Sequence, residues 1–279
     1  MPKAKGNWAD IPAVELDPLT YAVSARDRSA VGMVEAALRH KQVMLAYQPV
    51  VLARDPERVA FHEGLIRILD ETGRIIPARD FIGVIEDSEL GRVMDCLALE
   101  KGLRTLAAHP DLRLSINMSA RSIGYARWAG ILKRGLRADP TVGERLILEI
   151  TEASAMLVPE LVTGFMGNMQ NKGVSFALDD FGAGFTSFRY LRNFLFDIVK
   201  IDGQFIRGIA HDPDNQVITS AIASLVRQFD MVTVAGKVEN AEDAEYLAYL
   251  GIDCLQGYFF GAPTVKPPWL EPAAREDSA

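Results

Sequence analysis

The sequence predicts an α/β protein whose strands close into an eight-stranded barrel. Short apolar runs alternate with longer amphipathic segments, and eight such runs occur within 279 residues. Continuously apolar strands joined by helical crossovers are typical of a parallel sheet covered by helices, and eight units at this length favour a closed barrel. An open doubly wound sheet is the alternative, although no GxGxxG motif follows the first strand.

The expected elements follow from the spacing of apolar residues. Helical spacing starts at Ser29 and ends at the basic run Arg39-His40-Lys41, which suits a helix C-terminus. The expected strands are 43–51, 60–68, 112–117, 146–150, 174–179, 198–201, 231–235 and 254–260. The expected helices between them are 82–108, 120–136, 158–172, 186–194, 215–229 and 241–249.

The two ends of the chain differ from its centre. Residues 1–28 are polar, contain three prolines and show no sustained period, so we expect an arm or linker. We expect one barrel domain over residues 29–265 and a polar C-terminal tail over 266–279.

The composition limits the partners. A net charge of -7 argues against binding a nucleic-acid polymer or an anionic membrane. No apolar run approaches the roughly 20 residues of a membrane span, and no apolar stretch follows Lys3 and Lys5 as a signal peptide requires. Cys96 and Cys254 stand in apolar contexts, as reduced thiols do. We therefore expect a cytoplasmic protein without membrane insertion, and metal ions to offset its acidity if its ligand carries phosphates.

Oxygen-bearing and amine side chains stand at the ends of the predicted strands, where a barrel gathers its site. They are Glu63, Asn117, Glu149 followed by Glu152, Asp179 followed by Asp180, Lys200 and Gln256. Oxygen ligands without His or Cys suit Mg²⁺ or Mn²⁺ rather than zinc, and several carboxylates can hold two ions about 3.5 to 4 Å apart for displacement at phosphorus.

Taken singly, each residue has an ordinary structural explanation. Asp179-Asp180 suits a helix cap or turn, Asn117 suits a cap, and Lys200 suits the surface. Neighbouring strand residues face opposite sides, so both aspartates serve one site only if their strand ends there. Their joint placement on strand ends favours a site over these alternatives.

The order of several motifs resembles the EAL domain of cyclic-di-GMP phosphodiesterases, over residues 30–263. The motifs are Tyr47-Gln48-Pro49-Val50, Glu63-Gly64-Leu65-Ile66-Arg67, Pro77 with Phe81-Ile82, Asn117-Met118-Ser119, Leu148-Glu149-Ile150-Thr151-Glu152, Asp179-Asp180-Phe181-Gly182-Ala183-Gly184-Phe185, Val199-Lys200-Ile201-Asp202 and Gln256-Gly257-Tyr258. The resemblance implies a modified TIM-type (β/α)₈ barrel that binds bacterial cyclic-di-GMP at its C-terminal face. In that family, two Mg²⁺ or Mn²⁺ ions and an activated water open one phosphodiester to give linear pGpG.

The resemblance also implies residue roles. The first metal would be held by Glu63, Asn117, Glu149 and Asp179, and the second by Asp179 and Asp180. Lys200 would orient the water, and Glu152 would anchor the loop 181–187, which in the family links the site to a dimer interface. The dinucleotide would contact Gln48, Leu65 and Arg67, with Gln256 beside the active site. A homodimer is the family expectation.

The sequence departs from the family pattern at two places. Gly64 replaces an alanine, and because Glu63 is retained we expect little effect. The second departure lies at the end of the seventh predicted strand, where the family has Val-Ala-Glu-Gly-Val-Glu and this chain has Val234-Ala235-Gly236-Lys237-Val238-Glu239. The family's catalytic glutamate therefore falls on Gly236, and Lys237 adds a cation. Glu239 would need a shifted strand end to substitute.

Three functions remain open from the sequence. The favoured one is a cyclic-di-GMP receptor that binds at least one metal ion and hydrolyses its ligand slowly or not at all, with a possible protein partner. The second is an active cyclic-di-GMP phosphodiesterase in which Glu239 or metal-bound water compensates. The third is an interaction module that uses the helices of the barrel, against which the near-complete set of metal-ligand types argues.

Overall fold

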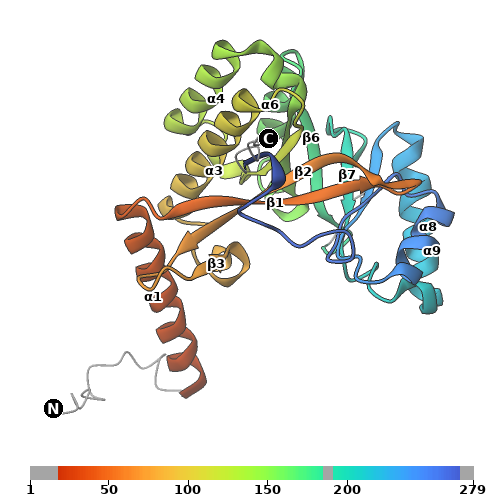
Figure 1. The fold of residues 1–279 in the computed structure, drawn as a ribbon, viewed down its shortest axis with the longest axis horizontal. Helices are drawn as coiled ribbons and strands as arrows, with labels where there is room; N and C mark the ends of the chain where they lie inside the picture. Colours follow the sequence, from red (N-terminus) through yellow and green to blue (C-terminus); the bar gives the residue numbers. More distant parts are fainter. Residues whose placement is uncertain (1–17, 185–190, 271–279) are drawn as a thin grey trace, which may run out of the picture.

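In the computed structural model, which describes residues 18–184 and 191–270, nine strands form one mixed sheet (Figure 1). They are β1 (Val43–Leu52), β2 (Asp55–Leu69), β3 (Ile75–Pro77), β4 (Leu114–Asn117), β5 (Leu146–Thr151), β6 (Ser175–Phe181), β7 (Ile198–Ile201), β8 (Val232–Ala235) and β9 (Cys254–Leu255). The order β1-β9-β8-β7-β6-β5-β4-β2-β3 is closed by pairing of β1 with β2, so eight strands form a barrel and β3 extends it. The predicted barrel is confirmed.

The first strand of the barrel runs against the others. β1 is antiparallel to both β2 and β9, whereas the other barrel strands, β2 and β4 to β9, run parallel to one another. The expectation that helices separate all eight strands was wrong here, because a turn of two residues, Ala53-Arg54, joins β1 to β2. So short a connection permits only an antiparallel hairpin.

Three strands, β2, β3 and β9, differ from the prediction by more than two residues or were not predicted. β2 begins at Asp55 rather than residue 60, and its first five residues are exposed, so they carry no apolar signal. β3 was not predicted, and β9 ends at Leu255 rather than residue 260. The other strands begin and end within two residues of their predicted bounds.

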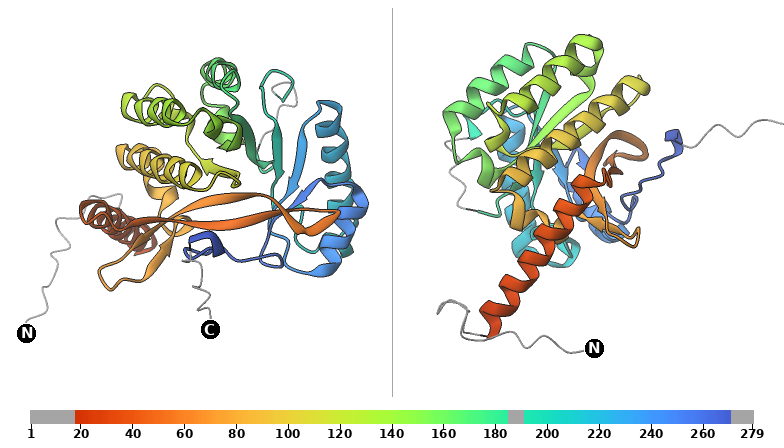
Figure 2. Two further views of the ribbon diagram at one scale, coloured as in Figure 1. Left: turned by 45° about the horizontal axis from the view of Figure 1, so that its top comes forward. Right: turned by 90° about the vertical axis from the view of Figure 1, so that its left-hand side faces the viewer.

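Helices cover the outside of the barrel, with α3, α4 and α6 on one side and α8 and α9 on another (Figures 1 and 2). The α-helices are α1 (Pro18–Arg39), α2 (Ile82–Ile85), α3 (Glu89–Ala108), α4 (Ala126–Ala138), α5 (Glu152–Ala155), α6 (Pro159–Gln170), α8 (Pro213–Gln228) and α9 (Ala241–Leu250). The predicted helix 82–108 is divided between α2 and α3, and Ser88 caps α3 by accepting the Leu90 N–H. Most of the predicted helix 186–194 lies outside the described residues.

Helix α1 begins eleven residues before its predicted start at Ser29. Proline is tolerated in the first turn of a helix, so Pro18 opens α1 rather than interrupting it. Ala30, Val34 and Ala37 are buried in a small core with Ile68 of β2. The N-terminal half of α1 extends away from the barrel (Figure 2).

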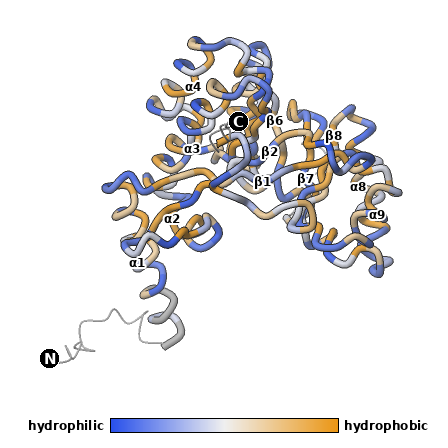
Figure 3. Tube along the Cα trace, in the orientation of Figure 1, coloured by the Kyte–Doolittle hydropathy of each residue, from blue (hydrophilic) through white to orange (hydrophobic). Residues whose placement is uncertain are grey.

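Two apolar layers lie on either side of the barrel wall. The larger core fills the space between the strands and the helices, and the strands are mostly hydrophobic in Figure 3. A smaller cluster with one residue from each of seven strands comprises Val50, Phe61, Ile147, Ala177, Ile198, Val234 and Cys254. Because strand side chains alternate between faces, the residue two positions along each strand lies on the same face as its member of this cluster.

Cys96 and Cys254 are both buried free thiols, as expected. Over the residues that the structure covers, no helix has the length and apolar character needed to cross a membrane.

Candidate metal and ligand site

A polar layer lies directly above the inner apolar cluster. Moving two residues along each strand from that cluster gives Gln48, Glu63, Glu149, Asp179, Lys200, Gly236 and Gln256, and Asn117 follows Ser115 in β4 by the same step. Each barrel strand thus supplies one position. Seven of the eight carry a polar side chain, and the strand β8 supplies Gly236.

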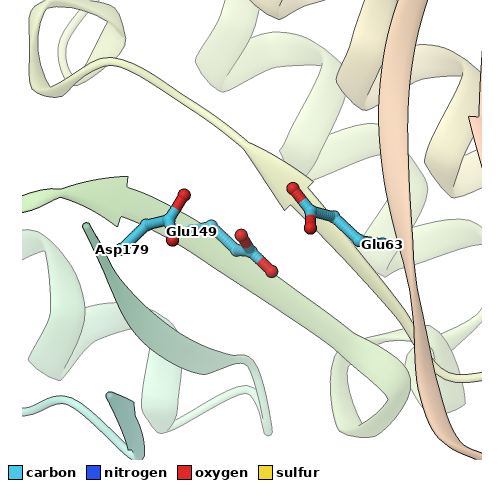
Figure 4. Close-up of side chains that lie close together, drawn as sticks. All are labelled: Glu63, Glu149 and Asp179. Atoms are coloured by element: carbon cyan, nitrogen blue, oxygen red, sulfur yellow. The ribbon is translucent and has the colours of Figure 1, made fainter. Parts of the chain in front are cut away.

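Three carboxylates of this layer form a compact group. Glu63 of β2, Glu149 of β5 and Asp179 of β6 each offer one oxygen, and these oxygens lie within 4.8 Å of one another (Figure 4). The Lys200 ammonium lies among them, with Nζ 2.9 Å from Glu63 Oε2, 2.6 Å from Glu149 Oε2 and 3.5 Å from Asp179 Oδ1. The sequence predicted that these four residues share a site, and the geometry brings them together.

Amide side chains complete the surroundings of Glu63. Asn117 Nδ2 donates to Glu63 Oε1 over 2.8 Å, and Gln256 Nε2 donates to Glu63 Oε2 over 2.6 Å. Gln256 Nε2 also lies 3.3 Å from Gln48 Oε1. The Gln256 amide therefore links Gln48 of the first barrel strand to the Glu63 carboxylate.

Burial and neighbouring charges shift the pKa values of these groups in different directions. Desolvation by burial raises the pKa of Glu149 to about 8, and Glu63 adds to the rise while Lys200 opposes it. Burial also opposes ionisation of Glu63, but Lys200 and hydrogen bonds from Gln256 and Asn117 outweigh it, so the Glu63 pKa is lowered. The pKa of Lys200 is raised despite its burial, because Asp179, Glu149 and Glu63 favour the charged ammonium.

Asp179 and Asp180 both reach the site although their strand does not end there. Strand β6 continues to Phe181, but its pairing with β7 shifts register between Leu178 and Phe181, and Asp180 adopts a left-handed φ of 53°. A bulge redirects side chains without ending the strand. The expectation that the strand ends at these aspartates was therefore wrong, and both side chains still line the same cavity.

Glu152 lies apart from the carboxylate triad. It is the first residue of α5, it is buried, and its Oε2 accepts the Gly182 N–H over 3.0 Å. This contact fixes the chain just after the aspartate pair. Residues 185–187, the rest of the loop assigned to Glu152, lie outside the described residues.

Six residues of the polar layer line a cavity of about 490 Å³: Gln48, Glu63, Asp179, Lys200, Gly236 and Gln256. Leu65 and Arg67 of β2, which the family resemblance assigns to ligand contact, also line this cavity. Arg79, Arg207 and Tyr258 also line it but received no role from the sequence. Tyr258 belongs to a motif quoted above, whereas no local pattern marked Arg79 or Arg207.

A hard divalent cation fits the donor set of the triad. All donors are carboxylate oxygens. Mg²⁺, Mn²⁺ and Ca²⁺ are commonly bound by oxygen ligands alone, whereas zinc is usually bound by nitrogen or sulfur ligands. In addition, Glu149 Oε1 is fully buried and has no hydrogen-bond partner in the structure. Buried polar atoms are rarely left unpaired, so an orphaned carboxylate oxygen within an acidic triad indicates space for a cation.

The barrel and its triad define a class of proteins that carry an acidic ligand site at one mouth of a mixed α/β barrel. The EAL domain model matches residues 31–263, most of the chain, and the chain belongs to the EAL domain family. Cyclic di-GMP phosphodiesterase PdeF of Escherichia coli is 32% identical over 234 residues, covering 82% of this chain and 31% of PdeF. Cyclic di-GMP phosphodiesterase PdeB of Shewanella oneidensis is 32% identical over 274 residues, covering 96% of this chain and 32% of PdeB.

A solved structure of the PaMucR phosphodiesterase in a c-di-GMP complex has the same fold. It is 30% identical, with a TM-score of 0.73 over 85% of this chain and 97% of that chain. The chain spans about a third of the length of the curated relatives, PdeF and PdeB.

Proposed function

We propose that this chain is a cyclic-di-GMP receptor that binds its ligand together with Mg²⁺ or Mn²⁺ and has impaired phosphodiesterase activity. The relatives support the ligand, since PdeF and PdeB are cyclic di-GMP phosphodiesterases and PaMucR is solved with c-di-GMP. The acidic triad and the amides around it support the metal.

The proposed impairment of phosphodiesterase activity rests on one observation, the glycine directly after β8. Gly236 occupies the one position of the polar layer without a side chain. The family pattern places a catalytic glutamate there, and glycine supplies neither a metal ligand nor a base. Losing such a group costs about 10² to 10⁴ in rate, the range for a general base, whereas binding through the remaining residues is retained.

The roles of the other residues follow the family pattern. Glu63, Asn117, Glu149 and Asp179 would hold one ion. The family pattern assigns a second ion to Asp179 and Asp180 together with the residue at position 236, which is a glycine here. A bound ion neutralises phosphate charge and lowers the pKa of a coordinated water. Lys200, whose ammonium already lies within 3.5 Å of the three triad carboxylates, would orient that water.

Three further residues of the cavity would contact the dinucleotide: Gln48, Leu65 and Arg67. Glu152 would hold the loop after β6 through Gly182. Dimer formation, with this loop linked to the interface, is proposed from the family pattern alone.

The second candidate is an active phosphodiesterase. It is favoured by retention of every other polar residue of the site. Glu239 lines the same cavity, but its Oε1 lies 3.5 Å from Arg207 Nε, so its carboxylate is already partnered.

One experiment separates the two functions. Purified protein is incubated with cyclic-di-GMP and Mg²⁺ or Mn²⁺ while bound ligand and linear pGpG are both followed. We expect binding with little or no product. Product at an ordinary enzymatic rate, roughly 1 to 10³ per second, would establish the active enzyme, and absence of binding would refute both.

A further inference from the structure

Lys237 lies across the mouth of the cavity from β8 toward β7. It directly follows Gly236 and adopts a left-handed φ of 60°. A Cβ atom built on Gly203, just after β7, would overlap the Lys237 side chain, with its Cγ only 2.8 Å away. The aliphatic part of Lys237 therefore packs on the glycine backbone, and this contact directs the side chain over the cavity that both residues line.

The cavity wall beneath Lys237 is acidic. Asp179 and Asp180 line the same cavity as Lys237, and Asp202 directly precedes Gly203, on which the Lys237 side chain packs. Three carboxylates thus lie near the Lys237 side chain. Negative charge concentrated in this way stabilises a nearby cation.

The ammonium of Lys237 is available to a ligand. Within the described part of the chain, no carboxylate oxygen lies within 4.0 Å of it. The neighbouring cation on this wall, Arg207, is paired with Glu239 at 3.5 Å. Lys237 therefore carries a positive charge at the cavity that no carboxylate of the described residues pairs with.

The same side of the cavity offers fewer ligands for a second divalent ion than the triad offers for the first. Among the described residues, the group of Glu63, Glu149 and Asp179 is the one set of three possible ligands close enough to share an ion. Asp180 is not part of such a set, and Gly236 offers no oxygen beyond its backbone. The described residues thus provide one site of three carboxylates and, in the lining of the same cavity, the Lys237 side chain.

We propose that Lys237 is a phosphate-binding residue whose ammonium replaces a second divalent ion, so that one phosphodiester of the ligand lies on the metal at the triad and is also held by Lys237. This inference rests on the proposed function and specifies how its ligand is held. An ammonium donates hydrogen bonds to phosphate oxygens as a point charge. It offers no open coordination position for a water, so it supports binding without generating a nucleophile.

The first test measures ligand affinity. Calorimetric titration of cyclic-di-GMP in Mn²⁺ compares the wild type, Lys237→Met and the matched control Lys172→Met, an exposed lysine in the turn before β6. We expect about 10-fold weaker binding for Lys237→Met, the usual effect of losing a hydrogen bond to a charged group, and no change for the control. Equal affinity of the wild type and Lys237→Met would overturn the proposal.

The second test counts ions without nucleotide. Electron paramagnetic resonance titration with Mn²⁺ should give one bound ion in the wild type and two in Gly236→Glu/Lys237→Gly. Two ions in the wild type, or one in the double variant, would overturn the replacement of an ion by Lys237. Failure of the wild type to bind cyclic-di-GMP would instead refute the proposed function. The ion count is measured without nucleotide, so its result does not depend on that function.

Discussion

The ammonium of Lys200 donates to Glu149 over 2.6 Å and is the counter-ion of three buried or half-buried carboxylates. Removing one partner of a buried ion pair costs about 3 to 5 kcal/mol. We expect Lys200→Met to lower the free energy of unfolding in EDTA by this amount. Mn²⁺ should stabilise the variant more than the wild type, because the ion supplies the missing positive charge. Thermal unfolding with and without Mn²⁺ measures both effects, and equal Mn²⁺ shifts would contradict this role.

Glu63 accepts from three donors and contributes to the triad, so its carboxylate should be essential for metal-assisted binding. We expect Glu63→Ala to weaken Mn²⁺ binding by about 100-fold, at the upper end of the loss seen when even outer partners of a metal site are removed. Cyclic-di-GMP binding in Mn²⁺ should be lost with it. The control is Glu100→Ala, which changes an exposed carboxylate of α3. Unchanged ion affinity in Glu63→Ala would exclude Glu63 from the site.

Restoring the carboxylate at the end of β8 should restore turnover. Among the described residues, a Cβ on Gly236 would meet no atom nearer than Ile201 O at 3.9 Å, so a side chain can start there without a clash. Lys237→Gly removes both the added cation and a side chain in a left-handed conformation that glycine adopts freely. We expect Gly236→Glu/Lys237→Gly to raise pGpG formation by about 10² to 10⁴. Lys237→Gly alone should not do so, and an unchanged rate in the double variant would refute the role of position 236.

The buried carboxylate of Asp95 should make stability depend on pH. Its Oδ2 accepts from the Ser119 N–H and the Ser122 hydroxyl, and burial raises its pKa to about 6. The folded state therefore binds this proton more tightly than the unfolded state, and stability is lost as pH rises from about 4 to 6. Urea unfolding measures the free energy of unfolding at pH 4 and pH 7. Between these two pH values, it should fall by about 2 to 3 kcal/mol more in the wild type than in Asp95→Asn. Parallel losses would contradict the raised pKa.

Gly257 should tolerate no side chain, because a Cβ there would overlap the backbone of Val238. We expect Gly257→Ala to cost about 3 kcal/mol, as severe overpacking does, and to weaken ligand binding through its neighbour Gln256. Gly164→Ala in α6 is the matched control, since open space surrounds that position. It should stabilise the helix by about 0.5 to 1 kcal/mol. Urea unfolding of both variants checks the contrast.

The sequence predicted the closed barrel and the set of residues at its mouth, because both depend on a periodic pattern. Apolar runs mark the strands, and seven of the eight barrel strands place a polar residue at a similar depth in or directly after the run. Glu63, Glu149, Asp179 and Lys200 were found in this way, and their oxygens and ammonium do meet.

Other features depended on contacts that no local pattern contains. The antiparallel β1 and the exposed start of β2 were missed because polar strand residues at a hairpin resemble a loop. Asp95 gave no signal, since its partners Ser119 and Ser122 lie on another element. Arg207 likewise reaches the cavity through the path of the chain after β7 rather than through any motif.

The antiparallel first strand also determines when the site can form. β1 is held between β2 and β9, and Tyr47 pairs further with Thr264 near the end of the described chain. Gln48 and Gln256 are 208 residues apart, and they contact each other only after β1 has paired with β9. Such long-range pairing is slow, because loop closure must come first. During synthesis, the chain therefore acquires its ligand-binding mouth only after nearly all of the domain has left the ribosome.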